Sequence, residues 1–173
     1  MLMARSLNLK RKIVVVAHNI RSTHNVGSLF RTLEGLGINE LVLTGYSPYP
    51  VLPSDDRLEH IVTKLTKQIN KTALGAVDNL KWSHSEDVQT VIAQYAAKGY
   101  YVYGLEQARN STNLLELKAP DKCLVVLGNE VDGIDKETLR LVNEIVEIPM
   151  VGKKESFNVV QASAMMLFYL RMS

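Results

Sequence analysis

The chain has 173 residues, of which 46% are hydrophobic and 22% are charged, and its formal net charge is +2. This composition is ordinary for a globular protein with one buried core, and it excludes a disordered or fibrous chain. Lysine and arginine together number 20 against 18 acidic residues, a balance too even to indicate a nucleic-acid partner by itself.

Cysteine usage and the N-terminal region bear on where the protein works. The single cysteine, Cys123, excludes an internal disulfide and fits a reducing compartment. Basic residues crowd the N-terminus at Arg5, Lys10, Arg11 and Lys12, without the apolar run of a signal peptide. We interpret them as a solvated face. Because no run of about 18 apolar residues occurs, no membrane span is expected, and we expect a cytoplasmic protein.

Short apolar runs alternate with helical patterns along the chain. Five runs have the length and the β-branched or aromatic content of buried strands: Lys12–Ala17, Glu40–Thr44, Tyr100–Leu105, Lys122–Leu127 and Glu144–Ile148. Five stretches between them have helical periodicity: Val26–Leu36, Asp56–Lys67, Glu86–Lys98, Lys136–Val142 and Phe157–Arg171. Strands that alternate with helices predict an α/β fold with a parallel sheet flanked by helices. No repeat or composition break divides residues 1–173, which we expect to form a single domain.

The first cluster of polar residues, His18–Thr32, leads from the first strand into the first helix, where ligands gather in open α/β sheets. Asn25 stands just before the apolar stripe of that helix, so we expect it to be the N-cap. Arg31 lies off the stripe, one turn beyond Gly27. It would lean back over this small residue, which would leave room for a substrate backbone. The alternative is an exposed arginine on an amphipathic helix.

The second cluster ends a buried strand in Gly128, Asn129 and Glu130. Gly128 would let a ligand approach the backbone, and Glu130 would place a carboxylate at the carboxyl end of the strand. The three-glycine spacing of a dinucleotide-binding loop is absent. An ordinary strand–helix loop is the alternative, and Asp135 is expected to cap the helix that follows.

The third cluster, Glu147–Asn158, ends a strand at Pro149 and opens the last helix with Ser156, Phe157 and Asn158. Ser156 or Asn158 could simply cap that helix. The helix itself is apolar around most of its circumference. It must therefore be buried in the core or against a second subunit.

Other kinds of site receive little support. The four histidines and the single cysteine lack a metal-ligand spacing, so we expect no metal. Trp82, Tyr100, Tyr101 and Tyr103 are expected to pack in strands and in the core. They do not suggest a base-stacking platform.

Taken together and in this order, the three clusters resemble the motifs of the SpoU/TrmH branch of the SPOUT methyltransferases. The first motif matches at Asn25, Arg31 and Thr32, and the second at Gly128, Asn129 and Glu130. The third matches at Ile148, Pro149, Met150, Ser156, Phe157 and Asn158, with Phe157 where leucine is usual. The stretch Lys71–Ala76 is similar to a further family segment, so the resemblance runs from about Lys12 to Tyr169.

The resemblance implies methylation of a ribose 2′-hydroxyl in structured RNA, tRNA rather than rRNA, with S-adenosyl-L-methionine as cofactor. It implies a C-terminal deep trefoil knot in the sheet-and-helix fold, and a homodimer with active sites at the interface. It implies no membrane partner. Since no appended RNA-binding domain is evident, the catalytic domain and its dimer partner would read the RNA by its shape.

The resemblance also assigns roles to individual residues. The catalytic set would be Arg31, Asn25, Glu130, Ser156 and Asn158. Because arginine is not deprotonated in proteins, Arg31 would hold a phosphate and stabilise the forming alkoxide. The cofactor would lie against Leu105, Gly128, Ile148, Met150 and Phe157. Candidate phosphate contacts to RNA are Arg21, Lys153 and Lys154.

Two other functions stay open. A non-catalytic RNA-binding protein could keep the knotted fold without methyl transfer. A small-molecule α/β enzyme could bind a nucleotide at the same strand ends. A cofactor-binding titration would distinguish the non-catalytic protein from a methyltransferase. Turnover without RNA would identify the small-molecule enzyme.

Overall fold

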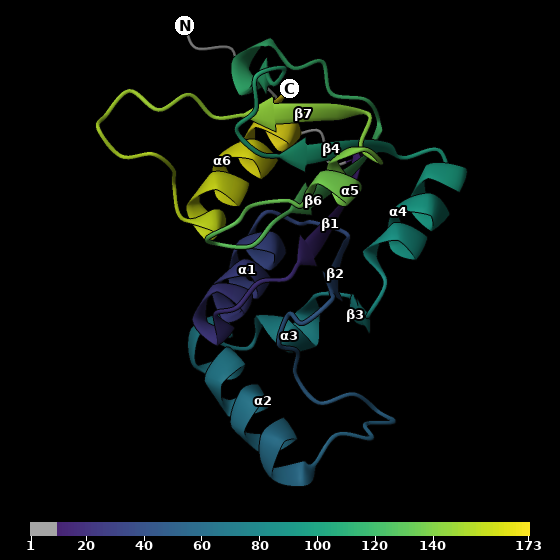
Figure 1. The fold of residues 1–173 in the computed structure, drawn as a ribbon. Helices are drawn as coiled ribbons and strands as arrows, with labels where there is room; N and C mark the ends of the chain where they lie inside the picture. Colours follow the sequence, from purple (N-terminus) through teal and green to yellow (C-terminus); the bar gives the residue numbers. More distant parts are fainter. Residues whose placement is uncertain (1–9) are drawn as a thin grey trace, which may run out of the picture.

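The structure is a computed structural model that describes residues 10–173, so Arg5 lies outside the described residues. Within this range seven strands form one sheet in the order β3-β2-β1-β6-β4-β7-β5, and all paired neighbours are parallel. The strands are β1 (Lys12–His18), β2 (Glu40–Thr44), β3 (Trp82–Ser85), β4 (Tyr101–Leu105), β5 (Thr112–Asn113), β6 (Lys122–Leu127) and β7 (Glu144–Glu147) (Figure 1). The predicted α/β fold with a parallel sheet is confirmed.

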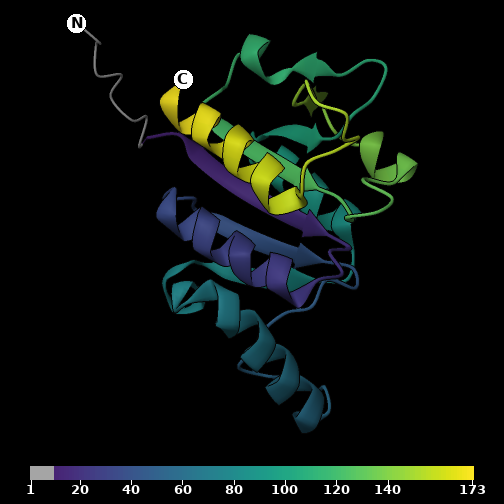
Figure 2. The same ribbon diagram turned by 90° about the vertical axis from the view of Figure 1, so that its left-hand side faces the viewer.

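Helices cover both faces of the sheet. They are α1 (Thr23–Gly35), α2 (Glu59–Ala73), α3 (Ala76–Asn79), α4 (Val88–Ala97), α5 (Lys136–Leu139) and α6 (Val159–Met172), with a 3-10 turn at Leu114–Glu116. Figures 1 and 2 show α1 and α6 side by side on one face, with α4 and α5 on the other. No helix in residues 10–173 is long and apolar enough to cross a membrane.

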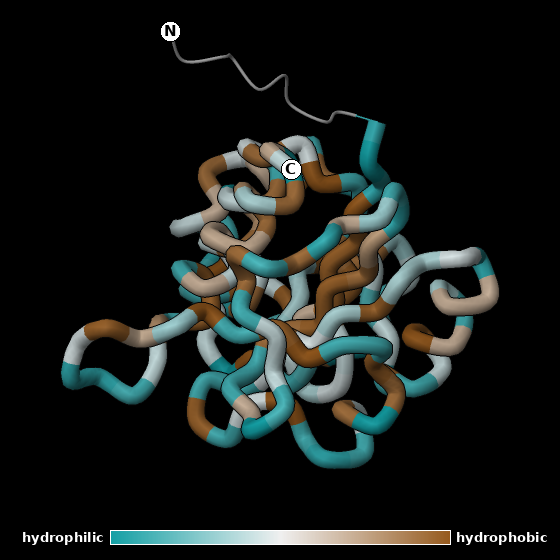
Figure 3. The backbone as a smooth tube through the Cα atoms, turned by 90° about the horizontal axis from the view of Figure 1, so that it is seen from above, coloured by the Kyte–Doolittle hydropathy of each residue, from teal (hydrophilic) through white to brown (hydrophobic). Residues whose placement is uncertain are grey.

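The side chains of β1 show how the core is divided. Ile13, Val15 and Ala17 pack in the layer with α1 and α6, whereas Val14 and Val16 pack in the layer with α4 and α5. A strand buried on both faces has no polar alternation, which is why β1 is a continuous apolar run. Figure 3 shows this hydrophobic backbone at the centre of the molecule and hydrophilic segments around it.

Strands β3 and β5 are not indicated by the sequence patterns. Both strands are short and partly exposed, and they form the two edges of the sheet. Edge strands of this kind carry polar residues and leave no apolar run to recognise. Trp82 of β3 packs edge-on against Phe30 with 5.7 Å between ring centroids. Tyr103 is buried as expected, but Tyr101 is exposed, so its expected place in the core is wrong.

Helix α1 begins before its apolar stripe, and the prediction of Asn25 as its N-cap is wrong. Ser22 is the cap, because its hydroxyl accepts a hydrogen bond from the Asn25 N–H at 3.2 Å. The apolar periodicity marks only the buried part of a helix and misses a polar first turn. The predicted cap of α5 is confirmed, since Asp135 Oδ1 accepts from the Thr138 N–H at 2.9 Å.

Gly27 lets α2 approach α1, so its predicted role of leaving room for a substrate is wrong. A Cβ at this position would lie 2.1 Å from Thr72 Oγ1 and 2.2 Å from the carbonyl oxygen of Ile69. Both atoms belong to α2, which fills the space over this buried glycine. Close packing of two helices is therefore the reason for the small residue.

Two buried arginines join the first strand to the last helix. Arg11 Nη1 donates to the carbonyl of Leu170, and Arg171 Nη1 donates to the carbonyl of Arg11 at 2.7 Å. Arg171 Nε also donates to the Leu36 carbonyl, just beyond α1, at 3.1 Å. Cations are favourable beside carbonyls at helix C-termini. The interpretation of Arg11 as part of a solvated face is therefore wrong.

We predict that Gly27→Ala lowers the free energy of unfolding by about 1–3 kcal/mol, because the added methyl group pushes α2 away from α1. The matched control is Gly35→Ala in the last turn of α1, where a Cβ would meet nothing within 4 Å. Alanine favours a helix over glycine, so this variant should be at least as stable as the wild type. Urea denaturation followed by circular dichroism measures both. Equal stability of the two variants would contradict the packing role of Gly27.

Candidate functional site

A cavity of about 320 Å³ opens at the carboxyl ends of β4, β6 and β7, beside the start of α6. This volume lies in the range of small-molecule sites. The connection after β1 leads to β2 on one side, whereas the connection after β6 leads towards β7 on the other. Ligands of open parallel sheets bind where neighbouring connections diverge in this way.

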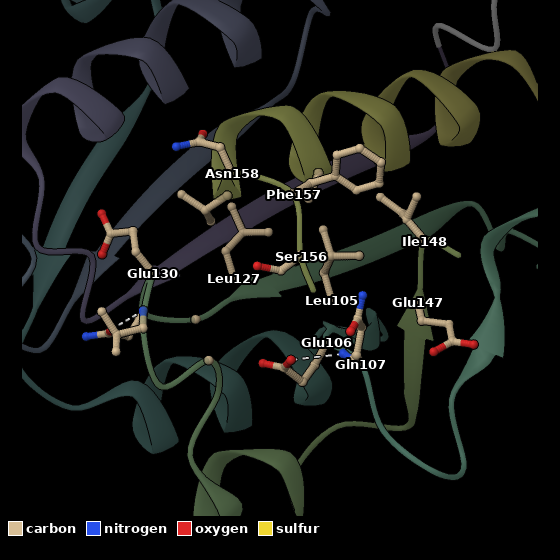
Figure 4. Close-up of a pocket in the computed structure, with 16 residues that line it drawn as sticks. Leu105, Glu106, Gln107, Leu127, Glu130, Glu147, Ile148, Ser156, Phe157 and Asn158 are labelled. Carbon is tan, nitrogen blue, oxygen red and sulfur yellow. Dashed lines mark hydrogen bonds between the residues drawn. The ribbon is translucent and has the colours of Figure 1, made fainter. Parts of the chain in front are cut away.

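The cavity has an apolar wall with carboxylates at its periphery. Figure 4 shows the side chains of Leu105, Leu127, Ile148 and Phe157 in this wall. Of the predicted cofactor residues, Leu105, Gly128, Ile148 and Phe157 line the cavity. Met150 lies two residues beyond Ile148 and is not part of the lining, so its predicted contact is not seen in this cavity.

The loop after β6 folds back on itself through backbone hydrogen bonds, and two glycines, Gly128 and Gly133, make room for this. Asn129 and Gly133 exchange two backbone hydrogen bonds, both at 3.0 Å. A Cβ on Gly128 would lie 2.4 Å from the carbonyl oxygen of Gly133 and from the nitrogen of Ile134. The loop itself fills the space on the Cβ side of Gly128, so no side chain fits there, while Gly128 also lines the cavity.

Glu106 ties β4 to this loop and is a site residue that the sequence interpretation missed. Its carboxylate accepts from the N–H of Ile134 and from the N–H of Gln107, both at 2.9 Å. Gly133 has a φ of +69°, and a Cβ there would lie 2.0 Å from Glu106 Oε2. The available signal was a carboxylate directly after a predicted strand, where side chains of a parallel sheet meet ligands.

Glu130 connects the loop after β6 to the loop after β1. Its carboxylate accepts from the N–H of Arg21 at 2.9 Å, the N–H of Ser22 at 3.1 Å and the Asn25 amide at 2.8 Å. Burial opposes ionisation of this group, but the three hydrogen bonds outweigh it and lower the pKa of Glu130 below its usual value. The carboxylate is therefore ionised at neutral pH.

Asn158 extends this network to the last helix. Its Nδ2 donates to Asn25 Oδ1 at 3.3 Å, and its Oδ1 accepts from the Val160 N–H at 2.9 Å. The capping interpretation of Asn158 is thus confirmed, and the same side chain also belongs to the polar cluster. Ser156 lines the cavity nearby. The structure therefore brings Asn25, Glu130, Ser156 and Asn158 to one place.

Arg31 lies apart from this cluster. It is six residues beyond Asn25, which is about 9 Å along a helix. Its side chain is exposed and faces a second cavity of about 900 Å³ between α1, the end of α2 and α6. Leu74, Met165 and Phe168 also line this second cavity. Within one chain the catalytic set predicted from the sequence is divided between two cavities.

The candidate phosphate contacts are all exposed. Arg21 Nη2 lies 3.4 Å from Asp132 Oδ2, and both side chains are more than half exposed, so this ion pair is weak. Lys153 and Lys154 lie on the loop between β7 and α6, which projects from the left side of the molecule in Figure 1. In the described part of the chain no group of three histidine, cysteine or acidic side chains could hold a metal ion.

We predict that Glu130→Gln lowers the free energy of unfolding by about 1–2 kcal/mol at pH 7, because a neutral amide accepts weaker hydrogen bonds than a carboxylate. The folded pKa lies below the unfolded one, so this stabilisation is present above the unfolded pKa and is lost as pH falls through the folded pKa. The difference from the wild type should therefore shrink between pH 7 and pH 3 in urea titrations. Glu34→Gln, on an exposed position of α1, is the control. A difference that stays constant with pH would contradict the assignment.

Comparison with known proteins places these observations in a family. Residues 12–168 match the model of the SpoU rRNA Methylase family. The chain is 28% identical over 157 residues to the tRNA (guanosine(18)-2′-O)-methyltransferase TARBP1 of Mus musculus, a match that covers 91% of this chain and 9% of that protein. It is 24% identical over 159 residues to a protein named for the TrmH family of tRNA/rRNA methyltransferases from Staphylococcus saprophyticus, covering 92% and 58%. The chain thus spans less than two thirds of either relative.

The fold has close counterparts among solved structures. An AdoMet-bound rRNA methyltransferase from Sinorhizobium meliloti matches with a TM-score of 0.78 and 20% identity, covering 98% of this chain and 58% of that one. All three sequence motifs lie inside the range that the family model matches, which confirms the resemblance they carry. The chain belongs to the SpoU rRNA methylase family.

Proposed function

We propose that this chain transfers a methyl group from S-adenosylmethionine to a ribose 2′-hydroxyl of structured RNA, tRNA rather than rRNA. The observation that carries the proposal is the convergence of the motifs on one cavity. Gly128, Glu130 and Asn158 line it, and Asn25 is hydrogen-bonded to the last two. The mouse relative, named for a tRNA guanosine, supports tRNA as the substrate.

The cavity suits the cofactor in size and in chemistry. Leu105, Ile148 and Phe157 offer apolar surface for an adenine ring. The carboxylates of Glu106 and Glu130 lie at the periphery, where they favour a cation. Bound S-adenosylmethionine would supply a methyl group on a positively charged sulfonium, which is a good leaving group. The protein would then mainly position the ribose and stabilise the charge on its 2′-oxygen, while the hydroxyl proton leaves to water.

Residues around the cavity divide these tasks. Glu130 already accepts three hydrogen bonds, so it acts as a positioning residue that holds the loop after β1. The hydrogen bond between Asn25 and Asn158 joins this loop to the start of α6. The hydroxyl of Ser156 lies at the cavity and orients the ribose. These side chains fix geometry, and the stabilisation of charge on the 2′-oxygen falls to Arg31.

A homodimer would complete the site by placing Arg31 of one subunit beside the cavity of its partner. Arg31 faces a groove with strongly exposed apolar side chains, Leu74 at 66% and Phe168 at 55%. Leu74 has a left-handed backbone with a φ of 49° because it caps the C-terminus of α2, and its N–H donates to the Asn70 carbonyl. An exposed apolar groove is typical of a protein interface.

The strand order supports a knotted C-terminus. Strand β7 lies between β4 and β5, although it follows both of them and β6 in the chain. The segment that leaves β7 for α6 therefore runs past the earlier connection between β4 and β6. We propose that this passage forms the deep trefoil knot.

Arg21, Lys153 and Lys154 would contact RNA phosphates, so RNA affinity should fall steeply with added salt.

The test is transfer of a labelled methyl group from S-adenosylmethionine to total tRNA and rRNA, followed by digestion to nucleosides. Label in a 2′-O-methyl nucleoside supports the proposal, and label only in a base would overturn it. Cofactor binding without transfer would favour the non-catalytic RNA-binding protein. Turnover of a small molecule without RNA would favour the nucleotide-binding enzyme.

We predict that Arg31→Ala lowers the rate of RNA methylation about 100-fold to 1000-fold, because one preformed donor to the developing charge is lost. Cofactor affinity, measured by calorimetry, should stay within about 2-fold, since Arg31 lies outside the first cavity. Arg140→Ala, on an exposed arginine after α5, is the control and should keep wild-type activity. Full methylation by the Arg31 variant would refute its role.

We predict that Phe168→Glu converts the dimer to monomers at micromolar concentration and abolishes methylation, because it buries a charge in an apolar interface. Leu115→Glu changes a still more exposed apolar residue outside the groove and should leave the dimer intact. Light scattering and sedimentation equilibrium measure both. A monomeric wild type that methylates RNA would show that no dimer is needed.

A further inference from the structure

We propose that a third cavity, beside the first, binds an RNA base next to the methylated nucleotide. This base pocket, of about 480 Å³, is lined by Arg21, Tyr46, Tyr49, Arg57, His84 and Glu86 among others. Neither the motifs nor the predicted RNA contacts include it, apart from Arg21. The inference rests on the proposed function, because it names how the RNA is held beside the same site.

The inner wall of the base pocket is a rigid stack of three flat groups. The Arg57 guanidinium lies 3.5 Å from the ring centroid of Tyr49, and the His84 ring lies 3.8 Å from it with an interplanar angle of 23°. Two planar groups this close to one centroid fit only on opposite faces of the ring. The order is therefore Arg57, Tyr49, His84. Such stacking is favourable in itself.

Arg57 supports this wall and is not available to a phosphate. Its Nε and Nη2 donate to the Asp55 carboxylate at 2.8 and 2.6 Å, and its Nη1 donates to the Tyr49 carbonyl at 3.1 Å. Nη2 also donates to the Pro50 carbonyl at 3.0 Å. The guanidinium charge is thus compensated inside the wall, and both side chains of the ion pair are largely buried.

The outer wall is an exposed ring that is nevertheless fixed. Tyr46 is 57% exposed, although exposed aromatic rings are costly to leave in water. Its hydroxyl is hydrogen-bonded to the side-chain amide of Asn129, and its backbone N–H donates to Asn19 Oδ1 at 3.1 Å. The side chain is therefore held in place while more than half of the residue stays exposed. This is the arrangement on which an unstacked RNA base is bound.

The base pocket and the first cavity share a wall. Tyr46 is bonded to Asn129, and the backbone of Arg21 is bonded to Glu130 at 2.9 Å. Asn129 and Glu130 both line the first cavity. A nucleotide whose ribose lies in the first cavity would place its next phosphate near the exposed Arg21 side chain. The following base then lies over the base pocket.

The charges of the base pocket favour a base over a phosphate as the occupant. Glu86 contributes a carboxylate, which repels phosphate and accepts hydrogen bonds from N–H groups on a base edge. Arg21, at the boundary with the first cavity, is the cation left to hold the phosphate. A polar pocket with a fixed, exposed tyrosine and one carboxylate therefore suits an RNA base with exposed N–H donors.

The test compares Tyr46→Ala with Tyr46→Phe, and Tyr101→Ala serves as the matched control. Tyr101 is an exposed tyrosine at the opposite end of the sheet. The readouts are the affinity for fluorescently labelled total tRNA by anisotropy, the KM and kcat of methylation, and cofactor affinity by calorimetry. Loss of one stacked base should weaken RNA affinity and raise the KM about 10-fold for Tyr46→Ala. Cofactor affinity should be unchanged.

The phenylalanine variant separates stacking from the hydroxyl contact to Asn129. It keeps the ring, so its RNA affinity should stay within about 2-fold of the wild type. If it falls as far as that of Tyr46→Ala, or if Tyr46→Ala binds RNA as tightly as Tyr101→Ala, the base pocket is refuted. Failure of the proposed function looks different, because the wild type itself would then not methylate RNA. The anisotropy arm tests the base pocket in either case.

Discussion

The carboxylate of Glu130 is the contact on which the geometry of the site depends. Strands β1 and β6 are neighbours, but the connections after them leave in opposite directions, so backbone pairing does not hold their loops together. Glu130 supplies that link by accepting three hydrogen bonds from residues 21–25. Asn25 then connects the link to Asn158 and the start of α6. The apolar core builds the layers, whereas this ionised group aligns the three motifs.

The fold could be predicted where burial leaves a pattern in the sequence. Strand β1 is covered on both faces and is apolar from Ile13 to Ala17, and its predicted and observed limits differ by one residue. Strand β3 lies at an edge, where partial exposure admits polar residues, and no pattern marks it. The same reason explains the early start of α1, because its first turn is polar and contributes no apolar side chain before Val26.

The sequence predicted which residues belong to the site better than it predicted how they are arranged. The motif order identified Asn25, Glu130 and Asn158, which do meet. The predicted role of Gly27 was wrong, and that of Gly128 left out the neighbouring loop, for one shared reason. A glycine shows that something approaches closely, and only the structure shows that the neighbour is α2 in one case and residue 133 in the other. Arg31 stands apart from the cluster because it lies six residues further along α1 than Asn25 and faces the second cavity beside α6.

The interlocked arginines have a consequence for how the protein is made. Arg171 donates to the carbonyl of Arg11 across 160 positions of the chain, and Arg11 in turn donates to Leu170. On a ribosome that adds about 5–20 residues per second, Arg11 emerges roughly 8–32 seconds before Arg171, its hydrogen-bond partner in α6. Contacts between such distant segments form late and slowly. The nascent chain must therefore leave part of one face of the sheet uncovered until α6 has emerged.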